Sequence, residues 1–296
     1  CKVCEISKYL YDFGSKTSII QNYSVLKENF ILSEHNYNYN LLIREKEIEL
    51  YNKLSSLERL NSKVQIHEGI HTGNSRDILF HDKKINENCK PLFYGGRAGD
   101  IIENFYSKRS KWFVDYRNEI IDKNKGFYAS LRDERIFKLP KLYITRTGNP
   151  IKVFYDEDNY ASNNFFSRQM KDYNLNNEDI LKSVLPLLLS SFSNYYIRTF
   201  CAPRLGETFV ETKIIHLLKI PIPKLLFTNL DVQKKFKDLV SKIIDTKKLN
   251  KIENIETLEA KIDIMVYKLY ELSYGEVLVV DPEFSLSEEE YNNYVY

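Results

Sequence analysis

Short aromatic-rich runs alternate with turn-forming residues between residues 91 and 168, and this alternation restricts the middle of the chain to β-structure. The turns include Gly148-Asn149-Pro150 and Asp156-Glu-Asp-Asn159, and runs this short between turns are typical of connected strands. The pattern predicts a mostly antiparallel or mixed sheet. Its expected strands are Leu92 to Tyr94, Lys111 to Tyr116, Lys141 to Thr145, Ile151 to Tyr155 and Asn163 to Phe166.

Helices are predicted on both sides of this sheet. Apolar residues recur at helical spacing over 40–60, over 178–200 and along two stripes that begin at Val232 and Ile255. Pro186 is expected near the first turn of its helix, Asn229 as an N-cap and Gly275 as a C′ residue. The predicted fold class is therefore α+β, a mostly antiparallel or mixed β-sheet domain with flanking helices and a C-terminal helical hairpin.

Charge is distributed unevenly along the chain, although the net charge is only +2. Residues 90–152 hold 14 Lys and Arg against 7 Asp and Glu, a net of +7, whereas residues 231–296 hold 9 against 14, a net of −5. A basic middle favours a nucleic-acid partner, and it is also compatible with an ordinary solvated face. Lys and Asn are abundant throughout, as in proteins from AT-rich genomes, so their number is weak evidence for a nucleic-acid partner.

Several classes of protein are disfavoured by the sequence. No run of about 18 apolar residues and no signal-like N-terminus occurs, so we expect no membrane span and a cytoplasmic location. Four scattered cysteines do not form a disulfide framework. The Cys1-Lys-Val-Cys4 pair and the group His67, His71 and His81 lack the partners of a metal site, so we interpret them as incidental thiols and as surface or hydrogen-bonding histidines.

The motifs, taken in order, resemble the target-recognition region of TaqI-like adenine DNA methyltransferases and type IIG restriction-modification enzymes. Each motif alone is weak, but their order over residues 20–280 is similar to that of the family. The matching segments are Gly69-Ile-His-Thr-Gly-Asn74, Pro91-Leu-Phe-Tyr-Gly-Gly-Arg97-Ala-Gly-Asp100, Lys138-Leu-Pro-Lys-Leu-Tyr-Ile-Thr-Arg146, Asn159-Tyr-Ala-Ser-Asn163-Asn164, Leu187-Leu-Leu-Ser-Ser-Phe-Ser-Asn-Tyr-Tyr196, Leu218-Lys-Ile-Pro-Ile-Pro223 and Ile262-Asp-Ile-Met-Val-Tyr-Lys-Leu-Tyr-Glu-Leu272.

The resemblance implies a module that reads DNA sequence but does no chemistry. The family's cofactor loop and its Asn-Pro-Pro-Tyr type loop are not found in this sequence. We therefore expect no cofactor in this chain, no catalytic or metal residues, and S-adenosylmethionine in a separate catalytic methyltransferase domain of the same parent chain. The expected partners are double-stranded DNA and that domain, and the parent's ability to cleave DNA stays open.

The implied organisation has three parts. Residues 1–36 are expected to be the tail of a preceding catalytic domain plus a linker, residues 37–225 the DNA target-recognition domain, and residues 226–296 a C-terminal helical hairpin or spacer. The start at Cys1 without an initiator Met fits a fragment of a longer protein. Two alternatives remain open, namely a protein-docking module of a bacterial DNA-defence complex and an α+β interaction domain unrelated to DNA.

Candidate DNA contacts are polar residues on predicted turns and strand ends. Arginine pairs with guanine, asparagine with adenine, and cations with phosphates. Each residue alone is better explained as a surface charge or a turn-forming residue, so the prediction rests on the set and not on its single members. The set is Thr72, Asn74, Arg76, Arg97, Lys108, Arg109, Lys111, Arg146, Asn163, Asn164, Arg168, Arg204, Thr208 and Lys213.

Overall fold

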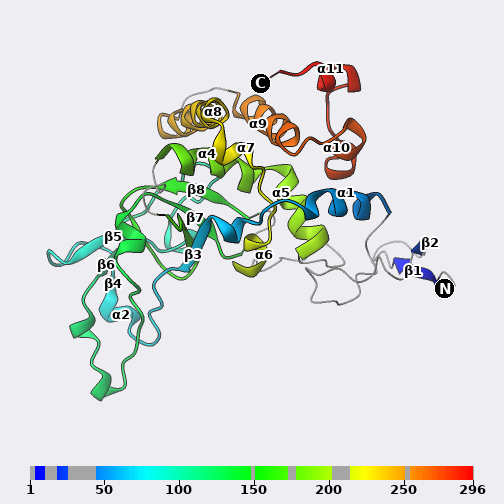
Figure 1. The fold of residues 1–296 in the computed structure, drawn as a ribbon. Helices are drawn as coiled ribbons and strands as arrows, with labels where there is room; N and C mark the ends of the chain where they lie inside the picture. The colour runs from blue at the N-terminus through cyan, green and yellow to red at the C-terminus, as the bar shows by residue number, and fades with distance from the viewer. Residues whose placement is uncertain are drawn as a thin grey trace.

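A four-stranded antiparallel sheet forms the middle layer of the molecule, between a layer of helices and a second sheet (Figure 1). The computed structural model describes residues 4–10, 19–25, 45–147, 151–172, 178–201, 214–250 and 254–295. Both helices and mixed sheets are present, so the predicted α+β class is confirmed.

The middle sheet has the strand order β3-β10-β7-β8, and all its pairs are antiparallel. Its strands are β3 (Val64–Glu68), β7 (Lys141–Thr145), β8 (Val153–Asp156) and β10 (Phe165–Met170). The prediction for β7 is confirmed at both ends. Pairing of Phe166 with Ile144 on one side and with Glu68 on the other fixes the register of the central strand β10.

The second sheet has the order β4-β6-β5-β9 and is mixed, because β5 and β9 run parallel. Its strands are β4 (Phe80–His81), β5 (Cys89–Phe93), β6 (Phe113–Asp115) and β9 (Tyr160–Ala161). Two further strands, β1 (Cys4–Leu10) and β2 (Ile19–Val25), form a separate antiparallel pair.

The described residues form two apolar cores, one on each face of the middle sheet. Phe166 and Met170 of β10 contribute to the core shared with the helices, whereas Phe165 contributes to the core shared with the second sheet. Successive side chains of a strand point to opposite faces, so β10 is buried along its whole length. This position between two layers decides the environment of every β10 side chain.

The helical layer includes long helices that pack through their apolar stripes. The helices are α1 (Glu45–Ser55), α2 (Arg76–Leu79), α3 (Arg135–Lys138), α4 (Glu178–Leu189), α5 (Ser191–Tyr196), α6 (Ile214–Leu218), α7 (Leu225–Thr228), α8 (Leu230–Lys248), α9 (Ile255–Leu269), α10 (Tyr274–Val280) and α11 (Glu288–Asn293), with a π-helical turn over Ile197–Cys201. None of the helices in the described ranges is long and apolar enough to cross a membrane.

The ends of these helices confirm one prediction and correct two. Asn229 caps α8, its side chain accepting hydrogen bonds from the backbone of Asp231 and Val232. Pro186 lies well inside α4 and not in its first turn. Gly275 lies within α10, while α9 ends at Leu269, and Glu271, two residues after that end, adopts a positive φ of 52°.

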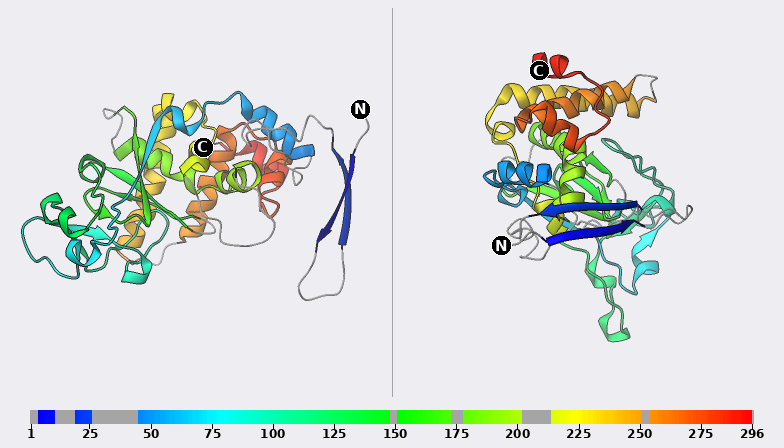
Figure 2. Two further views of the ribbon diagram at one scale, coloured as in Figure 1. Left: turned by 90° about the horizontal axis from the view of Figure 1, so that it is seen from below. Right: turned by 90° about the vertical axis from the view of Figure 1, so that its right-hand side faces the viewer.

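Residues from both sides of position 225 share the larger core. Val184 and Leu188 of α4 lie in the same apolar cluster as Val240 and Ile243 of α8 and Val266 of α9. Figure 2 shows α8 and α9 lying against the rest of the helical layer. The C-terminal helices therefore pack directly on the part of the chain that carries the sheets.

Candidate nucleic-acid interface

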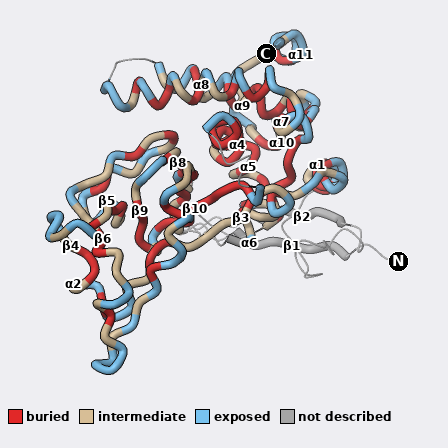
Figure 3. Tube along the Cα trace, turned by 60° about the vertical axis from the view of Figure 1, so that its left-hand side comes forward, coloured by how far each residue is buried: buried red, intermediate tan, exposed pale blue. Residues whose placement is uncertain are grey.

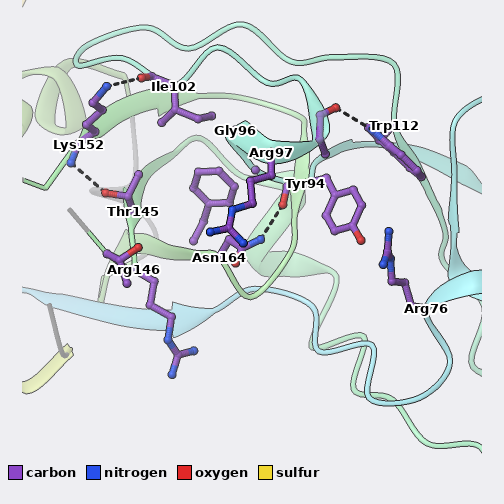
Figure 4. A pocket seen from close by; sticks show the side chains of 14 residues that line it. Arg76, Tyr94, Gly96, Arg97, Ile102, Trp112, Thr145, Arg146, Lys152 and Asn164 are labelled. Carbon is purple, nitrogen blue, oxygen red and sulfur yellow. Dashed lines mark hydrogen bonds between the residues drawn. The ribbon is translucent and has the colours of Figure 1, made fainter. Parts of the chain in front are cut away.

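A surface groove of about 910 Å³ opens where the loops that follow β5 and β7 meet the start of β10. Its described lining contains four cations and no carboxylate, which makes it attractive to an anion. We call it the basic groove. It is lined by Arg76, Tyr94, Gly95, Gly96, Arg97, Ala98, Ile102, Trp112, Thr145, Arg146, Thr147, Lys152, Asn164 and Phe165 (Figure 4).

The loop that carries Arg97 is held by a buried carboxylate. Asp100 is 5% exposed, and one of its oxygens accepts hydrogen bonds from the backbone N–H groups of Tyr94 and Gly95, each at 2.7 Å. Its other oxygen accepts from the N–H of Ser110 at 2.7 Å. Charge-assisted bonds of this length are strong, so Asp100 ties the Arg97 loop to the segment that leads into β6.

Glycine is required at one position of this loop. Gly95 has φ +128°, and a Cβ there would lie 3.1 Å from the side-chain nitrogen of Asn164. That nitrogen donates to the carbonyl of Tyr94 at 2.7 Å. The missing side chain lets Asn164 pack against the loop, which brings two segments about 70 residues apart to the same wall of the groove.

Aromatic rings form a second part of the groove wall. Trp112 and Tyr94 meet edge to face, with ring centroids 5.0 Å apart, and the Trp112 indole N–H donates to the carbonyl of Ala98 at 3.0 Å. The guanidinium of Arg76 lies over the Tyr94 ring, 5.2 Å from its centroid. These contacts fix flat apolar surfaces beside the cations, as in sites that contact sugars and bases.

The four cations differ in how they are held. Lys152 donates to the carbonyl of Ile102 at 2.8 Å, and Arg146 forms an ion pair with Glu68 at 3.3 Å. No hydrogen bond or ion pair within the described chain occupies the guanidinium of Arg97, which is exposed in the groove. Arg97 is thus the cation most available to a ligand.

A small polar network lies at the edge of the groove around Glu68. Its carboxylate contacts His71 at 2.9 Å, Arg132 at 3.0 Å and Arg146 at 3.3 Å, while the Asn163 amide lies 3.4 Å from the other ring nitrogen of His71. Burial alone would raise the pKa of Glu68, but the hydrogen bond with His71 and the two arginines hold it below its ordinary value. Glu68 therefore stays charged and orients Arg146.

The structure brings together four of the residues predicted from the sequence as DNA contacts. Arg76, Arg97, Arg146 and Asn164 all line the basic groove. Asn163 belongs to the polar network around Glu68 through its contact with His71, and Thr72 lies on the turn before Arg76. Arg204, Thr208 and Lys213 lie outside the described residues.

The predicted basic cluster near β6 lies outside the groove lining. Lys108 is exposed, Lys111 pairs with Asp82 at 3.0 Å, and Arg109 donates to the carbonyl of Trp112 at 2.7 Å. Arg109 also stacks over Phe113, 5.1 Å from the ring centroid. Arg109 therefore has a structural role beside Trp112, while Lys108 and Lys111 remain on the surface.

Arg168 requires a correction. It was predicted to contact DNA, but it is 0% exposed and none of its three guanidinium nitrogens has a hydrogen-bond partner. It lies on β10 on the same face as Phe166 and Met170, so it points into the core under the helices. Burial lowers its pKa to about 9. The helical layer, which a strand pattern cannot reveal, excludes it from any surface.

Sequence reasoning missed Lys152, Tyr94 and the threonines of the groove. Lys152 is the second residue after the predicted turn at 148–150 and lies opposite Thr145, whose hydroxyl accepts a hydrogen bond from the Lys152 backbone at 3.0 Å. Pairing the predicted strands 141–145 and 151–155 across that turn would have placed Lys152 beside Arg146. Nothing in the sequence indicates that Tyr94 would stack under Arg76.

No metal site is found in the part of the chain that the structure describes, where no three His, Cys, Asp or Glu side chains are suitably grouped. Of the three clustered histidines, His71 pairs with Glu68 and His81 contacts the carbonyl of Ile78 at 3.1 Å. Cys89 and Cys201 are free thiols.

The chain is similar to known proteins in structure and not in sequence. No protein-family model matches the chain, and no curated protein sequence does. Among solved structures, the HsdS subunit from Thermoanaerobacter tengcongensis is similar at 12% sequence identity and a TM-score of 0.30. The similarity covers 76% of this chain and 51% of that subunit, so the chain spans about half the length of that protein.

Proposed function

We propose that this chain is a DNA target-recognition module, and that duplex DNA binds in the basic groove. The observation that carries the proposal is the composition of the groove, where Arg76, Arg97, Arg146 and Lys152 meet without a carboxylate in the described lining. Phosphate contacts of this kind supply most of the affinity of proteins for DNA. The ordered motifs that resemble TaqI-like recognition regions give independent support.

The same groove offers groups that can distinguish bases. An arginine fork pairs with guanine and a carboxamide pairs with adenine in the major groove. Arg97, whose guanidinium is unoccupied within the described chain, and Asn164, which uses one N–H for the Tyr94 carbonyl, are the candidates for base contacts. Lys152 and Arg146, which are anchored at the edge, are better suited to phosphates.

We further propose that the parent protein is a site-specific adenine DNA methyltransferase or a type IIG restriction-modification enzyme. In that arrangement residues 37–225 hold the recognition surface and residues 226–296 support it, while a catalytic domain of the same parent binds S-adenosylmethionine and transfers the methyl group. This chain alone is expected to bind DNA and to transfer no methyl group.

The test uses the full 296-residue chain and its single tryptophan, Trp112, which lines the groove. Titration with duplex DNA should change the Trp112 fluorescence. The triple variant R97A/R146A/K152A should weaken binding and reduce the steepness of log K against log salt concentration by about 2 units, since Arg146 and Lys152 are each assigned a phosphate contact that contributes about 0.9.

The control is R198A, which removes an exposed arginine that does not line the groove. Its salt dependence should equal that of the wild type. DNA binding with unchanged Trp112 fluorescence and an unchanged salt slope in the triple variant would place the DNA elsewhere. Absence of binding to any duplex, including a randomised pool, would refute the proposal.

A further inference from the structure

Residues 117–132, between β6 and α3, project from the second sheet as a narrow arm. Figure 1 shows it as the green extension at the bottom of the molecule, beside α2, and the right-hand view of Figure 2 shows the same green extension from the side. In Figure 3 its tip is pale blue, because residues 123–126 are all exposed. We call residues 117–132 the projecting arm.

The base of the arm is firmly attached to the body of the molecule. Ile121 and Leu131 are buried in the core between the two sheets. The Tyr116 hydroxyl donates to the carbonyl of Arg132 at 2.7 Å, and the backbones of His71 and Ser130 exchange two hydrogen bonds of 3.0 and 2.7 Å. The arm is thus a built element that leaves the surface in a defined direction.

The tip is ordered by its own turn. A 3-10 turn spans Lys123–Lys125, with the Asp122 side chain accepting from the Asn124 N–H at 3.0 Å. Gly126 ends the turn with φ +79°, and the Phe127 N–H returns to the Asp122 carbonyl at 3.1 Å. The two lysine side chains are therefore presented from a fixed backbone.

Asn74 links this tip to the turn that precedes Arg76. Its side-chain oxygen accepts from the Tyr128 N–H at 2.9 Å, and its nitrogen donates to the Gly126 carbonyl at 3.0 Å. Ser75 adds a bond from its hydroxyl to the Tyr128 carbonyl at 3.0 Å. Asn74 was predicted to contact DNA itself, but its amide is committed to the arm.

The surface of the tip has the chemistry of a nucleic-acid contact. Tyr128 is 63% exposed, and its ring lies against Gly73, where a Cβ would come within 2.4 Å of it. Lys123 and Lys125 are exposed on the turn that precedes it, and Lys125 contacts the Asp122 carboxylate at 3.5 Å. A rigid exposed aromatic on the same tip as cations can pack on deoxyribose or a base while the ammonium groups contact phosphates.

We propose that the projecting arm is a second DNA-contacting element, which follows the sugar–phosphate backbone of the duplex held in the basic groove, and that Asn74 is the residue that positions it. The inference rests on the proposed function. The connection between the arm and the groove supports the proposal, because Asn74 is hydrogen-bonded to the arm and lies only two residues before Arg76, which lines the groove. The arm thus extends the basic surface along the duplex.

The first experiment compares salt dependence of duplex binding by the full chain. The variant K123A/K125A should lower the slope by about 2 units, one for each phosphate contact. The matched control K234A/K261A removes two exposed lysines from α8 and α9, at the other end of the molecule from the arm, and should change nothing (Figure 1).

The second experiment tests the role of Asn74 with a double-mutant cycle. N74A should lower the slope like the lysine variant, because the released tip no longer holds its cations in place. Added to K123A/K125A/Y128A, which already lacks the tip's side chains, it should have almost no further effect on affinity, whereas a direct contact of Asn74 with DNA would add its own loss of affinity. Additive losses would therefore overturn the positioning role.

Failure of this inference can be told apart from failure of the proposed function. If the groove triple variant weakens binding while K123A/K125A and Y128A leave both slope and affinity unchanged, the arm does not contact DNA and the groove still does. If neither set changes binding, or if the chain binds no duplex, both proposals fall. Thermal unfolding of each variant checks that the fold is retained.

Discussion

Arg168 is the side chain whose surroundings differ most from those expected of its type. A charged group in an apolar core without a hydrogen bond is costly, because nothing in the protein replaces the water it has lost. The guanidinium of Arg168 is in this position, between the strand neighbours Ile66 and Leu142. Its depressed pKa, about 9, expresses the same penalty.

We expect R168M to raise the free energy of unfolding at pH 7 by about 1–4 kcal/mol, since an apolar side chain of similar volume removes the buried charge. R168K, which keeps the charge, should give no such gain. Because burial lowers the folded-state pKa, the wild-type penalty should shrink only as the pH rises above about 9. Urea unfolding of R168M, R168K and the wild type, at pH 7 and above pH 9, tests these three expectations. A less stable R168M would mean that the guanidinium is paired with something the folded chain binds.

At the scale of single elements, the loop over 94–100 shows how one buried group can shape a surface. Asp100 accepts three backbone hydrogen bonds and thereby fixes the approach of Arg97 to the groove. Without the carboxylate, three N–H groups would lose their acceptor. Unmade bonds of this kind cost more than the net value of the bonds themselves.

We therefore expect D100A to lower the free energy of unfolding by about 2–4 kcal/mol and to weaken DNA binding, although Asp100 itself cannot contact DNA. D77A, which removes an exposed aspartate from α2, is the matched control and should change stability by less than about 0.5 kcal/mol. Calorimetry and fluorescence anisotropy measure the two effects. Stability equal to the wild type in D100A would show that the loop is held by other contacts.

At the scale of the whole molecule, stability depends on carboxylates that are perturbed in opposite directions. Burial raises the pKa of Asp263 on α9 to about 6, even though the backbone and hydroxyl of Ser191 donate to it at 2.9 and 2.8 Å. By contrast, the hydrogen bonds from Arg135 lower the pKa of Asp133 to about 2. Asp263 therefore favours the folded state at low pH, where it is protonated, and Asp133 favours it at neutral pH, where it is ionised.

The sign for Asp263 gives a pH-dependent prediction. A raised folded-state pKa contributes stability below the ordinary value of 3.8, and that contribution is lost as the pH rises through about 6. D263N cannot ionise, so its stability relative to the wild type should rise by about 2–3 kcal/mol from pH 4 to pH 7. Urea unfolding of both proteins over this range tests it. A constant difference at all pH values would contradict the assignment.

Local patterns in the sequence were sufficient to predict much of the secondary structure. A short aromatic-rich run between turns predicted the bounds of β7, and Asn229 was identified as the cap of α8 because its side chain and the following turn interact within a few residues. The α+β class follows from the order of such patterns. The prediction that Gly275 ends a helix was wrong, because Glu271, which lies nearer to the end of α9, is the residue that adopts a positive φ.

The candidate site could be predicted only in part, since a groove joins segments whose distance apart depends on packing. Arg76, Arg97, Arg146 and Asn164 were each identifiable as polar residues near turns, whereas their meeting with Lys152 depends on the register of β7 with β8 and β10. The sequence by itself determined which segments form strands and helices, because those choices depend on neighbouring residues. Tertiary structure alone decided that Arg168 is buried and that Asn74 holds the arm, because burial and long-range hydrogen bonds depend on layers contributed by distant parts of the chain.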